Sequence, residues 1–170
     1  MDKLDKKGST VYLIGNGGSA AIAEHMAVDF TKIARLRALA VSSCSMVTAL
    51  SNDFGYEQMF QKIVSYYIRK GDVLIVISSS GMSKNIIEAC KKVKEKGGIV
   101  ITFSGFKEDN LLKKEGDYNF WVDSNEYGYV EIIHNLLLHY ISDTIVCVRM
   151  GRTVTIDVQE HAKRRSKCQQ

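Results

Sequence analysis

The chain of 170 residues contains no proline, and it has no apolar run long enough to cross a membrane. A membrane-spanning helix needs about 20 apolar residues, and the first residues, MDKLDKKGST, are charged. We therefore expect neither insertion nor secretion, but a cytoplasmic protein. No Pro/Ser-rich linker marks a domain boundary before Gly151. We predict a single domain over residues 1–150, followed by a tail of residues 151–170.

The chain also lacks cysteines spaced as in a zinc knuckle or a redox motif, because its four cysteines are scattered. Reduced thiols in the cytosol fit this pattern. The formal net charge is +4, but the excess lies in the tail at Lys163, Arg164, Arg165 and Lys167. A basic tail alone is a weak indication of nucleic-acid binding, so we expect no nucleic-acid partner. The tail either adds a small strand and a helical turn or stays partly disordered.

Apolar runs alternate with segments of helical periodicity along the chain. Continuous apolar runs at residues 11–14, 73–77 and 99–103 predict buried strands, because a half-exposed strand would alternate polar and apolar residues. Shorter strands are predicted at 39–41 and 119–122, and helices at 20–32, 56–67, 85–96, 111–112 and 129–148. This alternation indicates an α/β protein, a three-layer α/β/α sandwich of Rossmann-like type around a central parallel sheet.

Two of the strand-to-helix turns are rich in glycine and serine. The first contains Asn16, Gly17, Gly18 and Ser19, and the second contains Ser78, Ser79, Ser80 and Ser83. In open parallel sheets, ligands collect at the carboxyl ends of strands, where helix N-termini offer N–H groups and partial positive charge. Either turn alone could be only a turn or a cap, but two of them favour a phosphate site. Neither matches a dinucleotide or P-loop motif, so no nucleotide cofactor is expected.

The segments GNGGSAAIAEHMAVDF, SNDFGYEQMF, GDVLIVISSSGMSKNII and VEIIHNLLLHYI follow one another in this order. Together they resemble the phosphoheptose isomerases of the SIS (sugar isomerase) family over residues 11–148. The ISxSGxS element is typical of SIS domains, and SNDFGYxxxF with the helical histidine is typical of the phosphoheptose branch. The resemblance implies an isomerase that converts sedoheptulose 7-phosphate to a heptose 7-phosphate through an enediol, for lipopolysaccharide or capsule heptose.

The resemblance also implies which residues carry the chemistry. The family uses a carboxylate on the first helix and a histidine on the last for proton transfer, which here are Asp29 and His139. Some members hold zinc with these groups, and His25 and Glu131 would complete such a metal site. His25 and Asp29 are four residues apart and share a helix face, while Glu131 and His139 are two turns apart on nearly one side. A simple side-chain pair and a packed histidine are the alternatives.

Substrate contacts are implied for both glycine- and serine-rich turns and for the segment after the second strand. The expected set is Asn16, Gly17, Gly18, Ser19, Asn52, Asp53, Ser78, Ser79, Ser80, Ser83 and Glu131. For Asn52 and Asp53, an Asx turn before a helix is an equal alternative. His134 falls on no catalytic position of the family, so we interpret it as structural.

Four features depart from the family pattern. The family usually has Glu at the position of Asp29, Gln at that of Glu131 and an acidic residue at that of Gly128. The shorter Asp29 suggests a reduced or altered substrate preference, because proton transfer tolerates little misplacement, and the added carboxylate of Glu131 should favour a cation. Family members also carry a helical arm before the first strand, which helps to build a tetramer with active sites between subunits. This chain has about ten residues there, but we still expect a homo-oligomer, a tetramer or a dimer.

A second hypothesis belongs to a different class. A noncatalytic SIS module would bind a phosphosugar or a protein partner and act as a regulator. Binding relatives tend to lose the helical histidine and the acid, whereas this chain keeps His139 and only shortens the acid to Asp29. We therefore favour the enzyme. Nucleic-acid association through the tail is a third and weaker hypothesis.

Overall fold

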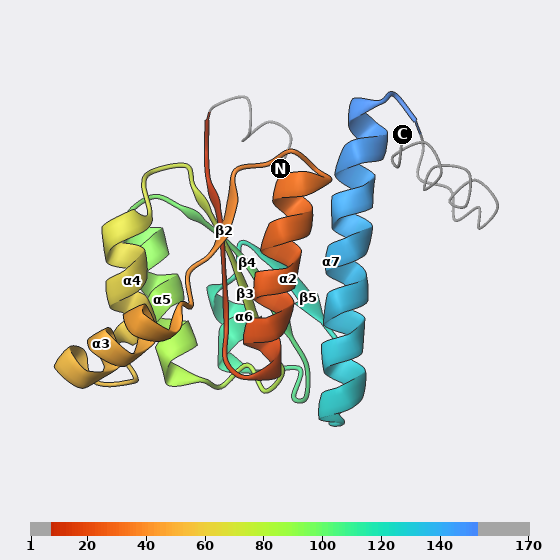
Figure 1. The fold of residues 1–170 in the computed structure, drawn as a ribbon. Coiled ribbons are helices and arrows are strands. Elements are labelled where there is room, and N and C mark those ends of the chain that lie inside the picture. Colours follow the sequence, from red (N-terminus) through yellow and green to blue (C-terminus); the bar gives the residue numbers. More distant parts are fainter. Residues whose placement is uncertain (1–7, 153–170) are drawn as a thin grey trace.

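The computed structural model describes residues 8–152, in which a five-stranded sheet is covered by helices on both faces (Figure 1). The strands are β1 (Val11–Gly15), β2 (Ala38–Ala40), β3 (Val73–Ser78), β4 (Ile99–Ser104) and β5 (Tyr118–Trp121). They lie in the order β2-β1-β3-β4-β5, and every pairing is parallel. The predicted three-layer α/β/α sandwich is therefore confirmed.

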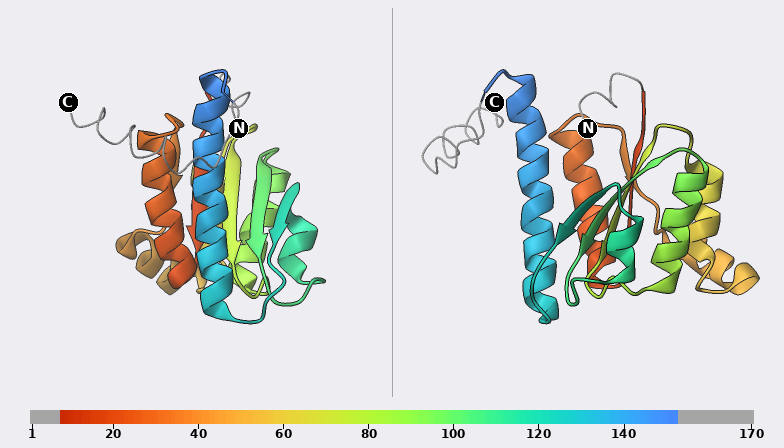
Figure 2. Two further views of the ribbon diagram at one scale, coloured as in Figure 1. Left: turned by 90° about the vertical axis from the view of Figure 1, so that its right-hand side faces the viewer. Right: turned by 180° about the vertical axis from the view of Figure 1, so that it is seen from behind.

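The helices divide between the two faces of the sheet. On one face lie α2 (Gly18–Lys32) and α7 (Tyr127–Arg149), and on the other lie α3 (Cys44–Phe54), α4 (Met59–Tyr67), α5 (Lys84–Glu95) and α6 (Leu111–Glu115) (Figures 1 and 2). Every residue of β3 is buried. Its side chains alternate between the faces, so that Ile75 packs with α2 and α7 whereas Leu74 packs with α4 and α5. This two-sided burial explains the continuous apolar run of the strand.

The register brings the carboxyl ends of the three central strands to one edge. Gly15 at the end of β1 pairs with Ile77, and Ser78 at the end of β3 pairs with Ser104. The turns that follow β1 and β3 therefore leave the sheet side by side, as the ligand-binding edge of an α/β sheet requires.

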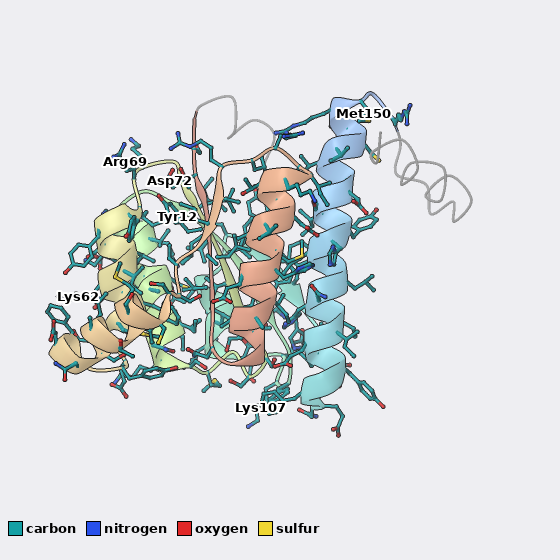
Figure 3. All side chains as sticks on the ribbon, in the orientation of Figure 1. Tyr12, Lys62, Arg69, Asp72, Lys107 and Met150 are labelled. Carbon is teal, nitrogen blue, oxygen red and sulfur yellow. The ribbon has the colours of Figure 1, made fainter. Side chains whose placement is uncertain are left out.

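The opposite edge of the sheet is tied together by a buried carboxylate. Asp72 accepts hydrogen bonds from the backbone N–H of Thr10 and of Arg69, each at 2.8 Å, which joins the starts of β1 and β3. Tyr12, Arg69 and Asp72 lie together at this edge, away from Lys107 at the carboxyl edge (Figure 3). Burial, aided by the negative charge of Asp72, raises the pKa of Tyr12.

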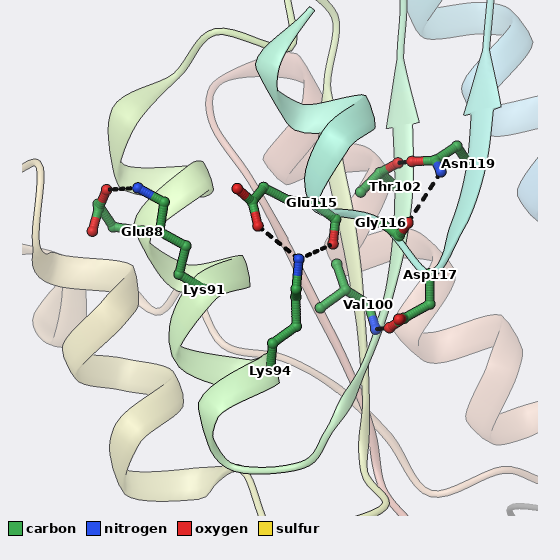
Figure 4. Close-up of polar contacts among 9 residues, drawn as sticks. All are labelled: Glu88, Lys91, Lys94, Val100, Thr102, Glu115, Gly116, Asp117 and Asn119. Carbon is green, nitrogen blue, oxygen red and sulfur yellow. Dashed lines mark hydrogen bonds and ion pairs between the residues drawn. The ribbon is translucent and has the colours of Figure 1, made fainter.

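Polar side chains also fix the end of the sheet that carries β5. The Thr102 hydroxyl donates to Asn119 Oδ1 at 2.6 Å, and the backbone N–H of Val100 donates to Asp117 Oδ2 at 2.8 Å (Figure 4). Lys94 on α5 pairs with Glu115 on α6 at 2.8 Å. These contacts hold α6 and β5 against the central strands.

Several sequence predictions differ from the structure. Helix α3 was not predicted; Leu50 is its only fully buried residue, and Met46 and Val47 pack against the core while partly exposed. Helix α4 begins at Met59 rather than at residue 56, because Gly55, at φ 84°, first ends α3. Lys163, Arg164, Arg165 and Lys167 of the predicted tail lie outside the described residues. None of the helices within residues 8–152 combines the length and apolarity needed to cross a bilayer.

Candidate active site

The turn after β1 exposes the backbone to solvent at the start of α2. Gly17 has φ 55°, a left-handed conformation that favours glycine, and Gly17 and Gly18 are both exposed. A Cβ at Gly15 would lie 2.6 Å from the backbone carbon and oxygen of Ser19. The turn is therefore too tight for a side chain there, and it presents exposed backbone at a helix N-terminus.

The turn after β3 is built from serine side chains. Ser83 precedes α5 and lies 3.4 Å from Ser78, oxygen to oxygen, while the Ser80 hydroxyl accepts from the backbone N–H of Met82 at 3.3 Å. Within the described chain, the buried Ser79 hydroxyl has no hydrogen-bond partner, and Ser83 makes no side-chain capping bond to α5. Serine hydroxyls beside a helix N-terminus are suited to binding a phosphate.

The two turns are joined directly by asparagine side chains. Asn16 Nδ2 donates to Asn85 Oδ1, and Asn85 Nδ2 donates to Asn16 Oδ1, both at 3.0 Å. Tyr56, in the loop between α3 and α4, donates its hydroxyl to Asn16 Oδ1 at 2.9 Å. Sequence reasoning missed Asn85 and Tyr56, since residues 69 and 40 positions from Asn16 carry no local signal of contact with it.

His25, Asp29 and His139 form a cluster between α2 and α7, which lie side by side (Figure 1). Asp29 Oδ2 lies 3.6 Å from His25 Nε2 and 3.3 Å from His139 Nδ1, and the two Nε2 atoms are 3.3 Å apart. Asp29 is 16% exposed, whereas the histidine side chains are 55% and 40% exposed. A carboxylate beside two accessible imidazoles can take up and deliver protons.

The geometry of this cluster also fits a metal ion. One ligand atom from each of the three residues lies within 4.8 Å of the others. Tetrahedral zinc with bonds of about 2.1 Å places its ligand atoms roughly 3.4 Å apart, close to the 3.3 and 3.6 Å that separate His25 Nε2 from its two neighbours. Imidazole and carboxylate are ligands that zinc accepts.

Glu131 lies apart from this cluster, against the first glycine-rich turn. A Cβ on Gly18 would be 2.7 Å from each carboxylate oxygen of Glu131. Eight residues of helix separate Glu131 from His139, which corresponds to about 12 Å along the axis of α7. The structure therefore brings together three of the four expected metal ligands and directs Glu131 to the start of α2.

Asn52 and Asp53 lie in the last turn of α3, not in a turn before a helix, so the Asx-turn alternative is wrong. Both residues are exposed, and Asn52 Nδ2 donates to Asp53 Oδ1 at 3.1 Å. Both side chains are therefore accessible to solvent or a ligand.

His134 is fully buried on α7, and its Nε2 lies 3.0 Å from the backbone carbonyl oxygen of Ser104 at the end of β4. Burial lowers the pKa of His134, so the ring is neutral and Nε2–H donates to the carbonyl. Its edge faces the ring of Phe103, with the centroids 5.8 Å apart. These contacts join α7 to β4 and support the interpretation of His134 as structural.

Comparison with known proteins bears directly on this arrangement. The SIS domain model matches residues 2–105, which is more than half of the chain. A phosphoheptose isomerase of Fusobacterium nucleatum is 36% identical over 144 residues, covering 82% of this chain and 74% of that protein. One of Clostridium acetobutylicum is 38% identical over 156 residues, covering 88% and 79%. The chain belongs to the phosphoheptose isomerase branch of the SIS family.

Solved structures of this branch share the fold. A phosphoheptose isomerase from Neisseria gonorrhoeae matches with a TM-score of 0.77 at 35% identity, covering 84% of this chain and 78% of that one. A phosphoheptose isomerase from Francisella tularensis matches with a TM-score of 0.78 at 28% identity, covering 84% and 80%. The SIS domain model ends before α7 and therefore does not cover His139.

Proposed function

We propose that this protein, an isomerase of the SIS family, interconverts sedoheptulose 7-phosphate and a heptose 7-phosphate. The observation that carries the proposal is the 3.3 Å contact between Asp29 and His139, which joins α2 to α7. Aldose–ketose conversion needs one group for the carbon-bound proton and one for the two oxygens. Asp29 and His139 offer both groups in contact with each other.

The proposed reaction is a proton relay through an enediol. Asp29 takes a proton from C1 of the ketose, while His139 gives a proton to the carbonyl oxygen on C2. The resulting enediol has a double bond between C1 and C2. Return of a proton to C2 and removal of the proton from the C1 hydroxyl give the aldose, so that no atom and no electron is gained or lost.

The phosphate group is held at the turn after β3 in this proposal. Ser78, Ser79, Ser80 and Ser83 provide hydroxyls there, beside the N-terminus of α5. The carboxylate of Glu131 lies against Gly18 and would repel a phosphate from the first turn. The first turn, Glu131 and the exposed Asn52 and Asp53 are therefore left for the sugar hydroxyls.

His25, Asp29 and His139 would hold a zinc ion where one is bound. The ion would supply Lewis-acid polarisation of a sugar oxygen. Three protein ligands are the number that catalytic rather than structural zinc sites have. Without the ion, the same side chains keep the contacts that permit proton transfer.

The assembly and cellular setting follow from the same proposal. Residues 1–150 act as one SIS domain in a cytoplasmic homo-oligomer, a dimer or a tetramer, that supplies heptose for surface polysaccharide. Four large apolar side chains of α7 support self-association, because each is at least 50% exposed: Tyr129, Ile132, Leu136 and Tyr140.

The direct test is turnover of the phosphorylated ketose. Purified protein should convert sedoheptulose 7-phosphate to a heptose 7-phosphate, identified by NMR, and should convert unphosphorylated sedoheptulose at least about 100-fold less efficiently, because a charge-assisted phosphate contact contributes a few kcal/mol. Ribulose 5-phosphate, with a shorter carbon chain, serves as the specificity control. Tight binding of sedoheptulose 7-phosphate without any conversion would contradict the proposal.

A further inference from the structure

Three side chains from separate parts of the chain meet at the carboxyl edge of the sheet. Asn16 follows β1, Tyr56 lies between α3 and α4, and Asn85 lies in the first turn of α5. The three contacts among them measure 2.9, 3.0 and 3.0 Å. The backbone N–H of Ile86 adds a bond of 2.9 Å to Asn85 Oδ1.

The hydrogen bonds in this group occupy the side-chain oxygens of both asparagines. Asn16 Oδ1 accepts from Tyr56 and Asn85, and Asn85 Oδ1 accepts from Asn16 and Ile86. An amide oxygen has two lone pairs, so neither oxygen has capacity for a sugar hydroxyl. Because the backbone N–H of Ile86 needs an acceptor, the side-chain atom of Asn85 that faces it is the amide oxygen. The orientation of the Asn85 amide in turn determines the orientation of the Asn16 amide.

Burial differs sharply between the two partners of Asn16. Asn85 is 3% exposed, whereas Tyr56 is 54% exposed. The Asn16–Asn85 pair therefore lies in a low-dielectric setting where its hydrogen bonds are costly to break. The Tyr56 hydroxyl closes the pair from the solvent side, and its loss would leave the hydrophobic core intact.

We propose that Asn85 and Tyr56 are positioning residues that act through Asn16. They lock the turn that begins α2 against the serine-rich turn that begins α5. Helix α2 starts at Gly18, two residues after Asn16, and carries His25 and Asp29. The lock therefore sets the distance between the phosphate, held at α5, and the carboxylate, held on α2. This inference rests on the proposed function and assigns Asn16 to holding the site together rather than to contacting the sugar through its oxygen.

A conservative variant tests the lock without disturbing the fold. Tyr56→Phe removes only the hydroxyl bound to Asn16 and should lower kcat about 5-fold, the equivalent of one net hydrogen bond of about 1 kcal/mol. KM and the Kd for inorganic phosphate should change less than 2-fold, since the serine-rich turn is untouched. Tyr66→Phe, at an exposed tyrosine of α4, is the matched control and should behave as the wild type.

A double-mutant cycle then shows whether Tyr56 acts through Asn16. In an Asn16→Ala background, Tyr56→Phe should have no further effect on kcat, because its acceptor is gone. A full additional 5-fold loss in that background would overturn the proposal, as would a Tyr56→Phe variant with unaltered kcat. Asn85→Ala should lower kcat further than Tyr56→Phe.

Amide hydrogen exchange provides a readout that does not depend on turnover. Tyr56→Phe and Asn85→Ala should speed exchange in the peptide that spans residues 16–22, at the start of α2, while Tyr66→Phe should not. Unchanged exchange in both variants would refute the lock even if the wild type is an active isomerase. The converse outcome is faster exchange in the two variants while the wild-type protein has no isomerase activity. That result would refute the proposed function and leave the lock in place.

Discussion

Asp29→Asn should lower kcat for sedoheptulose 7-phosphate by about 10²–10⁴-fold, the contribution of a positioned general base. The amide keeps the size of the carboxylate but cannot accept the carbon-bound proton. Asp29 Oδ2 also orients His139 at 3.3 Å, so the substitution affects both proton-transfer groups. Steady-state kinetics with the purified variant measure the loss, which should appear in kcat more than in KM.

Two further variants separate this role from a structural one. Asp123→Asn removes an exposed carboxylate from the segment between β5 and α7 and should leave kcat within 2-fold of wild type. Asp29→Glu keeps a carboxylate on the same face of α2 and should retain more activity than Asp29→Asn. Wild-type turnover by Asp29→Asn would remove Asp29 from the mechanism.

Gly81→Ala should destabilise the fold and disrupt the serine-rich turn. Gly81 has φ 62°, and a Cβ there would lie 2.2 Å from Asn110 Oδ1. Asn110 cannot move aside easily, because it is buried and its side chain donates to Lys107 O at 2.8 Å and accepts from Lys113 N at 3.0 Å. A residue other than glycine at this positive φ is strained, and the buried Asn110 side chain would have to move. Together these effects should lower the free energy of unfolding by about 2–4 kcal/mol.

Urea unfolding measures this cost, and titration with inorganic phosphate measures the damage to the turn. The stability loss should be accompanied by at least about 10-fold weaker phosphate binding, since the loss of one charge-assisted bond costs about 1.5 kcal/mol or more. Gly128→Ala is the matched control, because Gly128 has open space around its Cα and lies in α7. It should be neutral or slightly stabilising. Phosphate binding that survives Gly81→Ala unchanged would place the phosphate elsewhere.

The sequence predicted the central layer well because that layer is buried on both sides. The apolar runs at β1, β3 and β4 can be recognised without tertiary information, and so can the glycine and serine signals at the turns that follow β1 and β3. Helix α3, which lies at the periphery of the core and fully buries only Leu50, escaped prediction. Pattern alone therefore predicts buried elements better than peripheral ones.

The candidate site was predictable only in part. The i,i+4 spacing of His25 and Asp29 predicted their shared face, and the structure places them 3.6 Å apart. The approach of His139 depends on how α7 packs against α2, which the spacing within α7 does not determine. The spacing of Glu131 and His139 within α7 was compatible with Glu131 as a fourth metal ligand. The carboxylate of Glu131 instead lies against Gly18, two helical turns from His139. Helical spacing therefore predicts which residues share one side of a helix more reliably than it predicts which side chains reach the same ligand.

Isomerisation carried out in D2O tests the proton relay most directly. His25 and His139 are 55% and 40% exposed, so protons held by the cluster can exchange with solvent. The heptose 7-phosphate should carry deuterium at C2, detected by NMR and mass spectrometry. Product that forms with no carbon-bound deuterium in any molecule would contradict proton transfer through the solvent-accessible cluster of Asp29 and His139.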